Sequence, residues 1–392
     1  MQSGFRIGRV LGINIRIDWS WLFIFFLITW NLSSVFSQQH PNWDPTLQWG
    51  VAVVAALLFF ISLLAHELAH SLMARAHGIS VRSITMFLFG GVSNIQRDPD
   101  SPRDEFLIAV VGPITSFIIG VALLLIGSLR VGPLPTSVMA NPTEVIGQLS
   151  PLPTMLLWLG SINVILGLFN LIPGFPLDGG RVLRSILWVL SGNLRRATLW
   201  ASRIGQTIAG AMIFSGIAML FGARLPFFGT GFANGLWLIF IGWFLNSAAA
   251  LGYEQTVVSD MLRYVPVKNM MRQHPPTVSP DITITELVHE NVFGTDDHAF
   301  PVLEHDRLEG LVTLEDIRAV AREAWDVTVV REIMTPTERL IAVSVDDDAA
   351  MALVRLKKYD VRQLPVLREG RLAGLLRRRD IVKWLQIQTE LV

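Results

Sequence analysis

Two histidines and a glutamate fall within five consecutive positions, His66-Glu67-Leu68-Ala69-His70. On an α-helix, side chains four residues apart project from one face, so both imidazoles can bind one metal ion. Glu67 lies one step around the helix, where its carboxylate can reach a water molecule at that metal. Zinc lowers the pKa of such a water to about 7, and a neighbouring carboxylate can accept its proton during attack on a carbonyl. The five residues therefore predict the site of a zinc hydrolase.

The surroundings of this motif favour a functional site over a surface helix that happens to carry two histidines. The pentapeptide occurs by chance in long helices, but here it follows residues 49–64, which are almost wholly apolar. Ionisable groups at the depth of a bilayer cost roughly 2.5–3.5 kcal/mol each on insertion scales and persist mainly where they serve a function. Three such groups within five residues therefore predict a metal site.

The composition is that of an integral membrane protein. Of 392 residues, 51% are hydrophobic and 16% are charged, whereas soluble domains carry about 25% charged residues. The chain has no cysteine, which excludes disulfides and thiolate metal sites, so zinc must be held by histidine and carboxylate. Its formal net charge of zero argues against a nucleic-acid partner. The first lysine is Lys268, so a charged, soluble part follows an apolar one.

Six apolar segments are long enough to cross a bilayer as helices. They are residues 19–36, 49–76, 106–129, 155–172, 204–221 and 232–251. Arginines concentrate in the connections on one side, and only Arg130 and Arg224 fall on the other, which predicts cytoplasmic termini. Residues 5–17 alternate polar and apolar side chains around Gly12, which predicts an amphipathic β-hairpin at the membrane surface.

Residues 83–95, between the second and third segments, are too short to span a membrane as a helix. They contain Phe87, Phe89 and Gly90, and the pair Gly90-Gly91 would break a helix. A β-hairpin or a re-entrant loop is predicted, and such backbone is tolerated at membrane depth where protein buries it. The stretch is either an edge strand that captures an extended substrate by main-chain hydrogen bonds or a plain structural loop.

The fourth apolar segment ends in a stretch rich in proline and glycine, from Asn170 to Gly180, that contains Asp178. A carboxylate on an irregular loop at membrane depth would be a natural third zinc ligand. Alternatively, Asp178-Gly179 forms an ordinary turn in a cytoplasmic loop. Spacing alone leaves both possibilities open.

Three motifs in this order resemble the site-2 protease family of intramembrane zinc metalloproteases. They are the segment from His66 to His70, the pair Gly112-Pro113, and Asn170–Pro173 followed by Leu177-Asp178-Gly179. The resemblance covers residues 1–252. Ser116 departs from the pattern, because some members have asparagine at this place after Gly-Pro.

The resemblance implies one zinc ion per chain, bound by His66, His70 and Asp178, with Glu67 as general base. Asn170 would stabilise the oxyanion or position the substrate. The substrate would be a single-span membrane protein, and the enzyme a multi-pass protein of a prokaryotic inner or plasma membrane. The alternative is a non-catalytic metal or ion transporter. A transporter has no use for a base directly after its first histidine, so Glu67 favours the protease.

The C-terminal part repeats itself. Residues 267–271, 300–303 and 308–312 correspond to residues 330–334, 364–367 and 372–376. This repeat resembles a tandem pair of CBS domains, predicted over residues 265–325 and 326–392 after a linker at 253–264. The predicted fold is therefore a polytopic α-helical membrane protein with about six transmembrane helices and a membrane-associated β-hairpin, followed by a soluble α/β CBS pair.

CBS pairs often bind adenine nucleotides, and the resemblance implies which residues would do so. Thr313 and Asp316 match the hydroxyl and the ribose-binding acid in the first repeat. In the second repeat Asp380 matches the acid, but Arg377 stands where a hydroxyl is expected. The alternative role of the pair is to form a homodimer.

Overall fold

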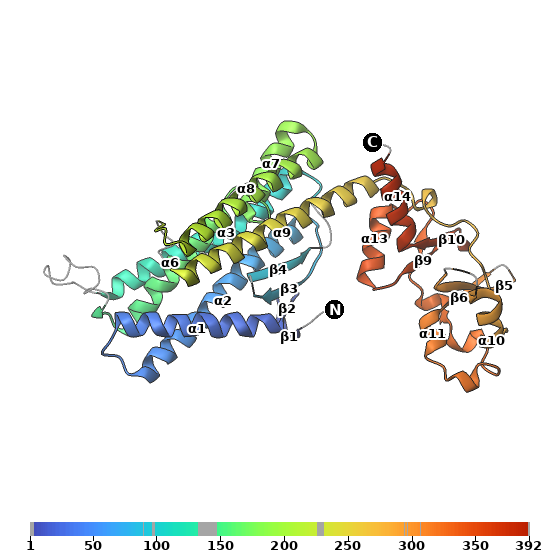
Figure 1. The fold of residues 1–392 in the computed structure, drawn as a ribbon, viewed down its shortest axis with the longest axis horizontal. Helices are drawn as coiled ribbons and strands as arrows, with labels where there is room; N and C mark the ends of the chain where they lie inside the picture. Colours follow the sequence, from blue (N-terminus) through green and yellow to red (C-terminus); the bar gives the residue numbers. More distant parts are fainter. Residues whose placement is uncertain are drawn as a thin grey trace. The chain divides into compact units, whose positions relative to one another are not determined.

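The computed structural model describes residues 4–88, 90–95, 99–131, 147–225, 231–293, 295, 297–305 and 307–390. The chain divides into two compact units, Met1–Glu254 and Gln255–Val392. Figure 1 shows long helices in the first unit and short strands and helices in the second.

Six helices of the described residues are long and apolar enough to cross a membrane, which confirms a multi-pass membrane protein. They are α1 (Trp19–Gln39), α2 (Pro45–Ala76), α3 (Pro102–Val131), α6 (Pro151–Asn170), α8 (Leu194–Leu220) and α9 (Phe232–Leu262). Several extend beyond the predicted apolar segments because polar residues cap them. For example, α2 begins at Pro45, where the Asp44 side chain accepts a hydrogen bond from the Thr46 N–H at 2.7 Å.

A seventh helix, α7 (Asp178–Ser191), was not predicted. We expected Asp178 on an irregular loop, but it lies in the first turn of this helix, so that expectation is wrong. Glycine permits the helix to start against the preceding loop: a Cβ at Gly179 would lie 2.3 Å from the Leu171 backbone, and one at Gly180 would lie 2.2 Å from the Phe175 nitrogen. The two glycines therefore allow close packing rather than marking a break.

The two predicted β segments of the first unit join in one four-stranded sheet of order β1-β2-β3-β4. Its strands are β1 (Phe5–Val10), β2 (Ile13–Ile17), β3 (Val81–Phe87) and β4 (Gly90–Ile95). Two antiparallel hairpins meet through the parallel pair β2/β3. One sheet face packs its isoleucines against Phe60 and Leu63 of α2. Strands β1 and β4 are therefore the two edges of the sheet.

The second unit contains two three-stranded sheets, one for each predicted repeat. The first has β5 (Ala299–Glu304), β6 (Arg307–Thr313) and β7 (Thr335–Pro336), and the second has β8 (Val343–Ser344), β9 (Gln363–Arg368) and β10 (Arg371–Arg377). The helices are α10 (Ile284–Leu287), α11 (Leu314–Arg318), α12 (Val330–Ile333), α13 (Ala349–Lys358) and α14 (Arg378–Glu390). This arrangement confirms the predicted α/β pair.

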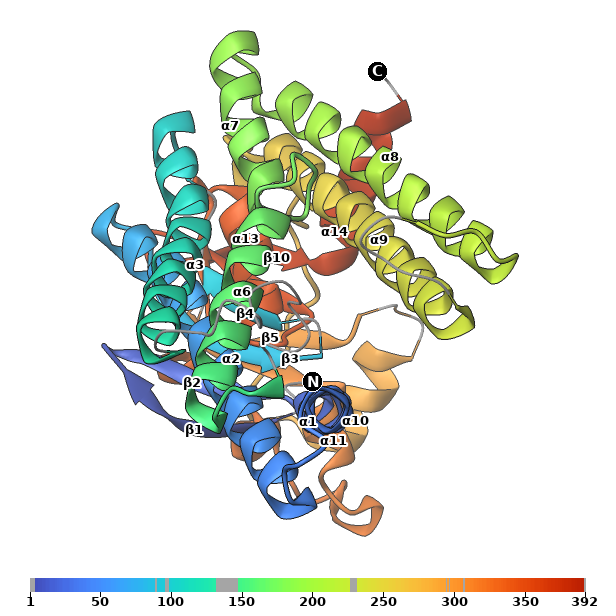
Figure 2. The same ribbon diagram turned by 90° about the vertical axis from the view of Figure 1, so that its left-hand side faces the viewer.

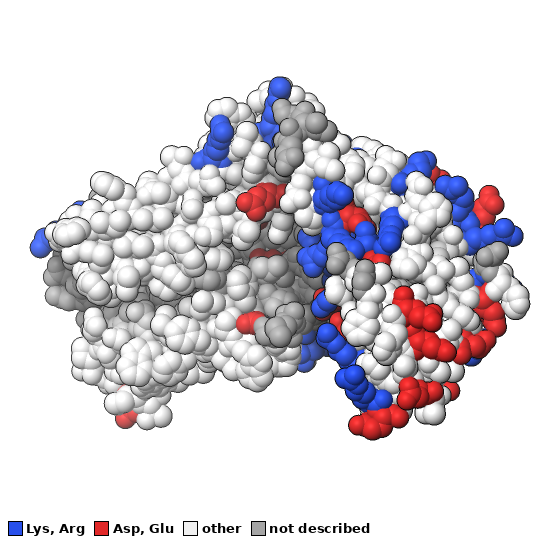
Figure 3. All heavy atoms as spheres, turned by 45° about the vertical axis from the view of Figure 1, so that its right-hand side comes forward, with Lys and Arg blue, Asp and Glu red and all other residues white. Residues whose placement is uncertain are grey.

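The two repeats exchange segments. Strand β7, which follows α12 near the start of the second repeat, pairs with β6 of the first repeat. In return Arg272, near the start of the first repeat, forms a bridge with Leu375 in β10 of the second. Lysine, arginine and acidic side chains cover the visible face of this unit, whereas the visible face of the first unit carries few of them (Figure 3).

Candidate metal centre and active site

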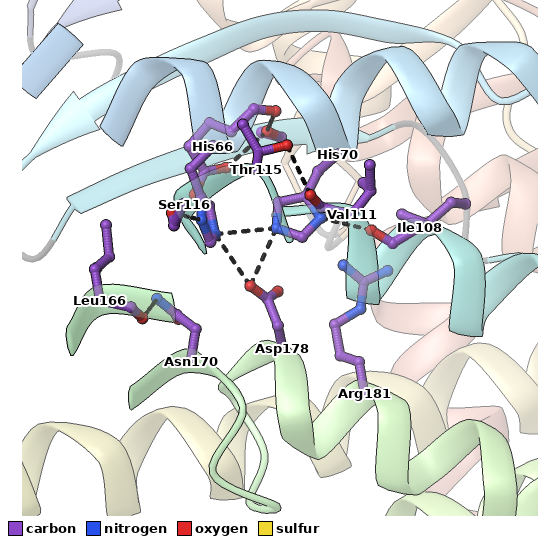
Figure 4. Close-up of polar contacts among 12 residues, drawn as sticks. His66, His70, Ile108, Val111, Thr115, Ser116, Leu166, Asn170, Asp178 and Arg181 are labelled. Carbon is purple, nitrogen blue, oxygen red and sulfur yellow. Dashed lines mark hydrogen bonds and ion pairs between the residues drawn. The ribbon is translucent and has the colours of Figure 1, made fainter. Parts of the chain in front are cut away.

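The α2 motif and the start of α7 bring three potential metal ligands together. His66 Nε2 and His70 Nε2 each lie 3.1 Å from Asp178 Oδ2, and the two Nε2 atoms lie 3.2 Å apart. These are ligand atoms of three residues, two of them buried, that could hold one metal ion. Figure 4 shows the carboxylate directed at both rings. The structure thus juxtaposes the three residues predicted to bind zinc.

The second nitrogen of each imidazole is engaged by α3. His70 Nδ1 donates a hydrogen bond to the Ile108 carbonyl oxygen at 2.6 Å, and His66 Nδ1 lies 2.9 Å from the Ser116 hydroxyl. A carbonyl oxygen only accepts, so Nδ1 of His70 carries a hydrogen, and in the neutral ring Nε2 is then the nitrogen whose lone pair can bind a metal. Such contacts orient metal-binding histidines. Ser116, which departs from the family pattern, is buried and contacts His66.

The surroundings of Gly112 in α3 leave no room for a side chain. A Cβ at this position would lie 2.1 Å from His70 Nε2 and 2.8 Å from His66 Nε2. Any larger residue would therefore fill the space in front of the two ligand nitrogens. Two imidazole nitrogens and one carboxylate oxygen are also a ligand set that zinc takes in catalytic sites, with a position left open for water or substrate. The residues present fit a zinc ion.

The side chain of Glu67, a residue of α2, lies against strand β4. The Ser93 hydroxyl donates to Glu67 Oε2 at 2.9 Å, and Ser71 Oγ donates to Ser93 Oγ at 3.0 Å. A Cβ at Gly91 would lie 2.4 Å from Glu67 Cγ, so β4 passes directly beside this side chain. Ser93 was not predicted to contact Glu67, because a contact between residues 26 positions apart depends on how the hairpin folds against α2.

Asn170 closes α6 next to the site. Its Nδ2 donates to the Leu166 carbonyl at 2.9 Å. In Figure 4, Asn170 and Arg181 flank Asp178. The amide group is thus engaged within its own helix, and the predicted role of Asn170 in catalysis stays a prediction.

The predicted substrate-binding residues lie where the two strands of the hairpin meet. Phe87 ends β3 and pairs with Gly90, which begins β4 with a φ of 131°. Phe89 lies outside the described residues. The hairpin is thus formed as predicted, but its role in substrate capture stays a prediction.

The predicted nucleotide-binding residues of the first repeat lie at the start of α11. Thr313 Oγ1 donates to Asp316 Oδ2 at 2.7 Å, and the Asp316 N–H donates back to Thr313 Oγ1. This capping box satisfies backbone donors at the helix start, which is a structural role for both residues. In the hydrogen bonds described for the Asp316 carboxylate, both Thr313 donors, the N–H and the hydroxyl, bind Oδ2.

In the second repeat, Arg377 forms hydrogen bonds to both carboxylate oxygens of Asp380, the predicted nucleotide-binding acid. Arg377 Nε lies 2.8 Å from Asp380 Oδ2 and its Nη2 lies 2.7 Å from Oδ1. Arg377 Nη1 also reaches the buried Asp297 at 2.8 Å, which in addition accepts from Arg272. Burial alone would raise the pKa of Asp297, but the hydrogen bonds from these two arginines outweigh it and lower the pKa below its usual range.

Comparisons with known proteins bear on both units. The model of peptidase family M50 matches residues 54–215, and that of the CBS domain matches residues 267–323 and 330–387. A Mycobacterium tuberculosis protein named "Putative zinc metalloprotease Rip3" is 31% identical over 389 residues, which cover 99% of this chain and 94% of the relative. The chain belongs to peptidase family M50.

Other known proteins are also similar to this M50 protein. "Zinc metalloprotease MJ0392" of Methanocaldococcus jannaschii is 27% identical over 391 residues, covering 99% of this chain and 97% of the relative. The solved structure of a site-2 protease from the same organism is 27% identical, covers 63% of this chain and 94% of that one, and has a TM-score of 0.42. The family match and the two named zinc metalloproteases confirm the predicted enzyme class, a zinc metalloprotease of the site-2 protease family.

Proposed function

We propose that this M50 protease hydrolyses a peptide bond within or next to the transmembrane segment of a single-span membrane protein, with one zinc ion held by His66, His70 and Asp178. The observation that carries the proposal is the convergence of His66 Nε2, His70 Nε2 and Asp178 Oδ2 within 3.1–3.2 Å of one another. Two of the three ligands, His66 and His70, lie on α2, a helix long and apolar enough to span a bilayer, which favours membrane proteins as substrates.

The chain's own groups supply the acid–base chemistry. When bound, zinc polarises the scissile carbonyl and makes a nearby water easier to deprotonate. Glu67 then accepts the proton of the attacking water on a carboxylate oxygen and passes it to the leaving nitrogen. The Ser93 hydroxyl, 2.9 Å from Glu67 Oε2, orients the carboxylate for this transfer. Asn170 is proposed to position the substrate or stabilise the oxyanion.

Strand β4 is proposed as the place where substrate binds. It is an edge of the sheet and lies directly beside Glu67. An extended peptide that pairs with β4 through main-chain hydrogen bonds would run past that carboxylate. Phe87 and Gly90 lie at the turn into this strand, and these two residues together with Phe89 are proposed to contact the bound segment.

The second unit is proposed to be a cytoplasmic regulatory module of a prokaryotic inner-membrane protein, with both termini on that side. The first repeat is the proposed site for an adenine nucleotide, with Asp316 contacting the ribose. The pairing of both Asp380 oxygens with Arg377 argues against an equivalent site in the second repeat. The domain boundaries 1–252, 253–264, 265–325 and 326–392 and a homodimer formed through the CBS pair remain part of this proposal.

The test uses the full chain in proteoliposomes with candidate single-span substrates. Removal of metal by a chelator should abolish cleavage, and added zinc should restore it. Asp178→Ala should lower bound zinc well below one ion per chain, because two histidines leave the ion under-coordinated. Chelator-resistant cleavage, or one zinc per chain in Asp178→Ala with normal turnover, would overturn the proposal.

A further inference from the structure

A buried ion pair joins α3 to α7 close to the candidate metal centre. Glu105 of α3 is 0% exposed and Arg184 of α7 is 3% exposed. Arg184 Nε donates to Glu105 Oε1 at 2.6 Å, and its Nη2 contacts the same oxygen. Arg181 Nε lies 4.0 Å from that oxygen as well. Oε2 has no hydrogen-bond partner among the residues that the structure describes. The Glu105 carboxylate thus binds Arg184 directly and lies close to a second arginine of α7, Arg181.

Burying two charged side chains carries a desolvation penalty, so this ion pair is expected to have a function. Glu105 lies in the first turn of α3 and is fully buried, and acidic side chains are almost never fully buried unless they are paired. Desolvation can exceed the mutual attraction of two buried charges, so a buried pair is weak evidence of a stabilising role. Apolar residues of similar volume would hold the two helices together equally well. They would lack the directional, charge-assisted contact in which Arg184 Nε and Nη2 both meet Glu105 Oε1.

The two helices that the pair connects are those that build the site. Along α3, Glu105 precedes Ile108 by one helical turn, and Ile108 accepts the hydrogen bond of His70. Along α7, Asp178, Arg181 and Arg184 are three residues apart, so Arg181 neighbours both Asp178 and Arg184 on the helix surface. Figure 4 shows Arg181 rising from α7 beside Asp178. The rotation and axial position of α7 against α3 therefore fix where the Asp178 carboxylate lies.

We propose that Glu105 and Arg184 are positioning residues, whose ion pair locks α7 on α3 so that Asp178 faces His66 and His70. This inference rests on the proposed zinc site but concerns residues outside the ligand set and the general base. Asp178 is the one ligand supplied by a separate helix, whereas the two histidines share α2. Loosening α7 should therefore disturb the third ligand and leave the histidines in place.

The first test measures the helices without metal. Because the chain has no cysteine, two spin labels can be attached at Ile118→Cys of α3 and Leu190→Cys of α7, both exposed positions. Electron–electron distance measurements on the metal-free full chain should show one narrow distribution, which broadens in Glu105→Gln. Asp104→Asn is the matched control: it removes the same charge one residue away, from a partly exposed side chain, and should leave the distribution narrow.

The second test uses cobalt(II) as a spectroscopic substitute for zinc. Glu105→Gln should bind cobalt at least tenfold more weakly and change its visible spectrum, while Asp104→Asn matches the wild type. Arg184→Lys keeps the charge but loses the contact through Nε and Nη2, so its cobalt affinity should fall between those of the wild type and Glu105→Gln. If Glu105→Gln does not fold, the cobalt affinity and spectrum of Arg184→Lys test the inference instead. Folded variants with the wild-type distance distribution and cobalt spectrum would overturn the inference. If the wild type binds no cobalt, the proposed zinc site fails, and the spin-label distances still test the lock between α3 and α7.

Discussion

His66 and His70 each have one ring nitrogen engaged by α3 and the other facing Asp178. Their spacing on α2 made them predictable, because positions four apart share a helix face. The groups that orient them were not predictable in the same way. Ser116 and the Ile108 carbonyl lie 50 and 38 residues away in the sequence, so their contacts exist only once α3 packs against α2.

Gly112 gives a prediction at this scale. Gly112→Ala places a methyl group where its neighbours cannot give way without moving the ligand nitrogens. We expect about a 10–100-fold loss of zinc affinity, comparable to the loss of an outer-shell partner. The measurement is zinc titration of purified full-length protein. Gly210→Ala is the control, since an added Cβ there meets no atom within 4 Å. Equal affinities in the two variants would contradict the close approach of α3.

At the scale of helices and strands, hydropathy patterns predict some elements and not others. The six spanning helices follow from apolar runs that only a membrane or a large core can accommodate. Helix α7 escaped prediction because its Gly-Gly start and its arginines, including Arg181 and Arg184, resemble those of a loop. The parallel pairing of β2 with β3 joins segments some 70 residues apart; local sequence encodes each hairpin, but not their union.

Strand β4 gives the prediction at the scale of elements. Val92→Pro removes a backbone N–H from this edge strand, so we expect substrate cleavage to fall about tenfold while bound zinc stays at one per chain. Ile7→Pro is the control: it alters β1, the other edge, at a bulge where the register shifts. Val92→Ala separates the backbone effect from loss of the side chain. Cleavage by Val92→Pro at the rate of Val92→Ala would leave β4 as a structural strand.

The whole molecule combines an M50 protease unit with a CBS unit. The sequence repeat predicted the second unit correctly, because each repeat keeps its strand–strand–helix order. It did not reveal that Asp297 would accept hydrogen bonds from Arg272 and Arg377, since that cluster forms between the repeats. Whether such a module regulates proteolysis is a question of coupling free energy, which a ligand can supply only through different affinities for two states.

Nucleotide regulation is the prediction at this scale. We expect ATP, ADP or AMP to change the cleavage rate of the full chain several-fold and Asp316→Asn to abolish the response, because the amide keeps the helix cap but loses the charge that holds the ribose. Glu315→Ala, which removes a neighbouring exposed charge, should respond like the wild type. Calorimetry of the full chain with no heat for any adenine nucleotide, together with nucleotide-independent cleavage, would reduce the unit to a dimerisation domain.

The most direct test of the central claim compares the wild type with Glu67→Gln in proteoliposomes, scoring zinc content and cleavage of a single-span substrate on the same preparations. Glutamine keeps the shape and the hydrogen bond from Ser93 but cannot accept a proton from water. We predict one zinc per chain in both proteins and a fall in cleavage rate of about 10²–10⁴-fold in the variant. A Glu67→Gln protein that binds zinc and cleaves within tenfold of the wild-type rate would contradict the assignment of Glu67 as the general base.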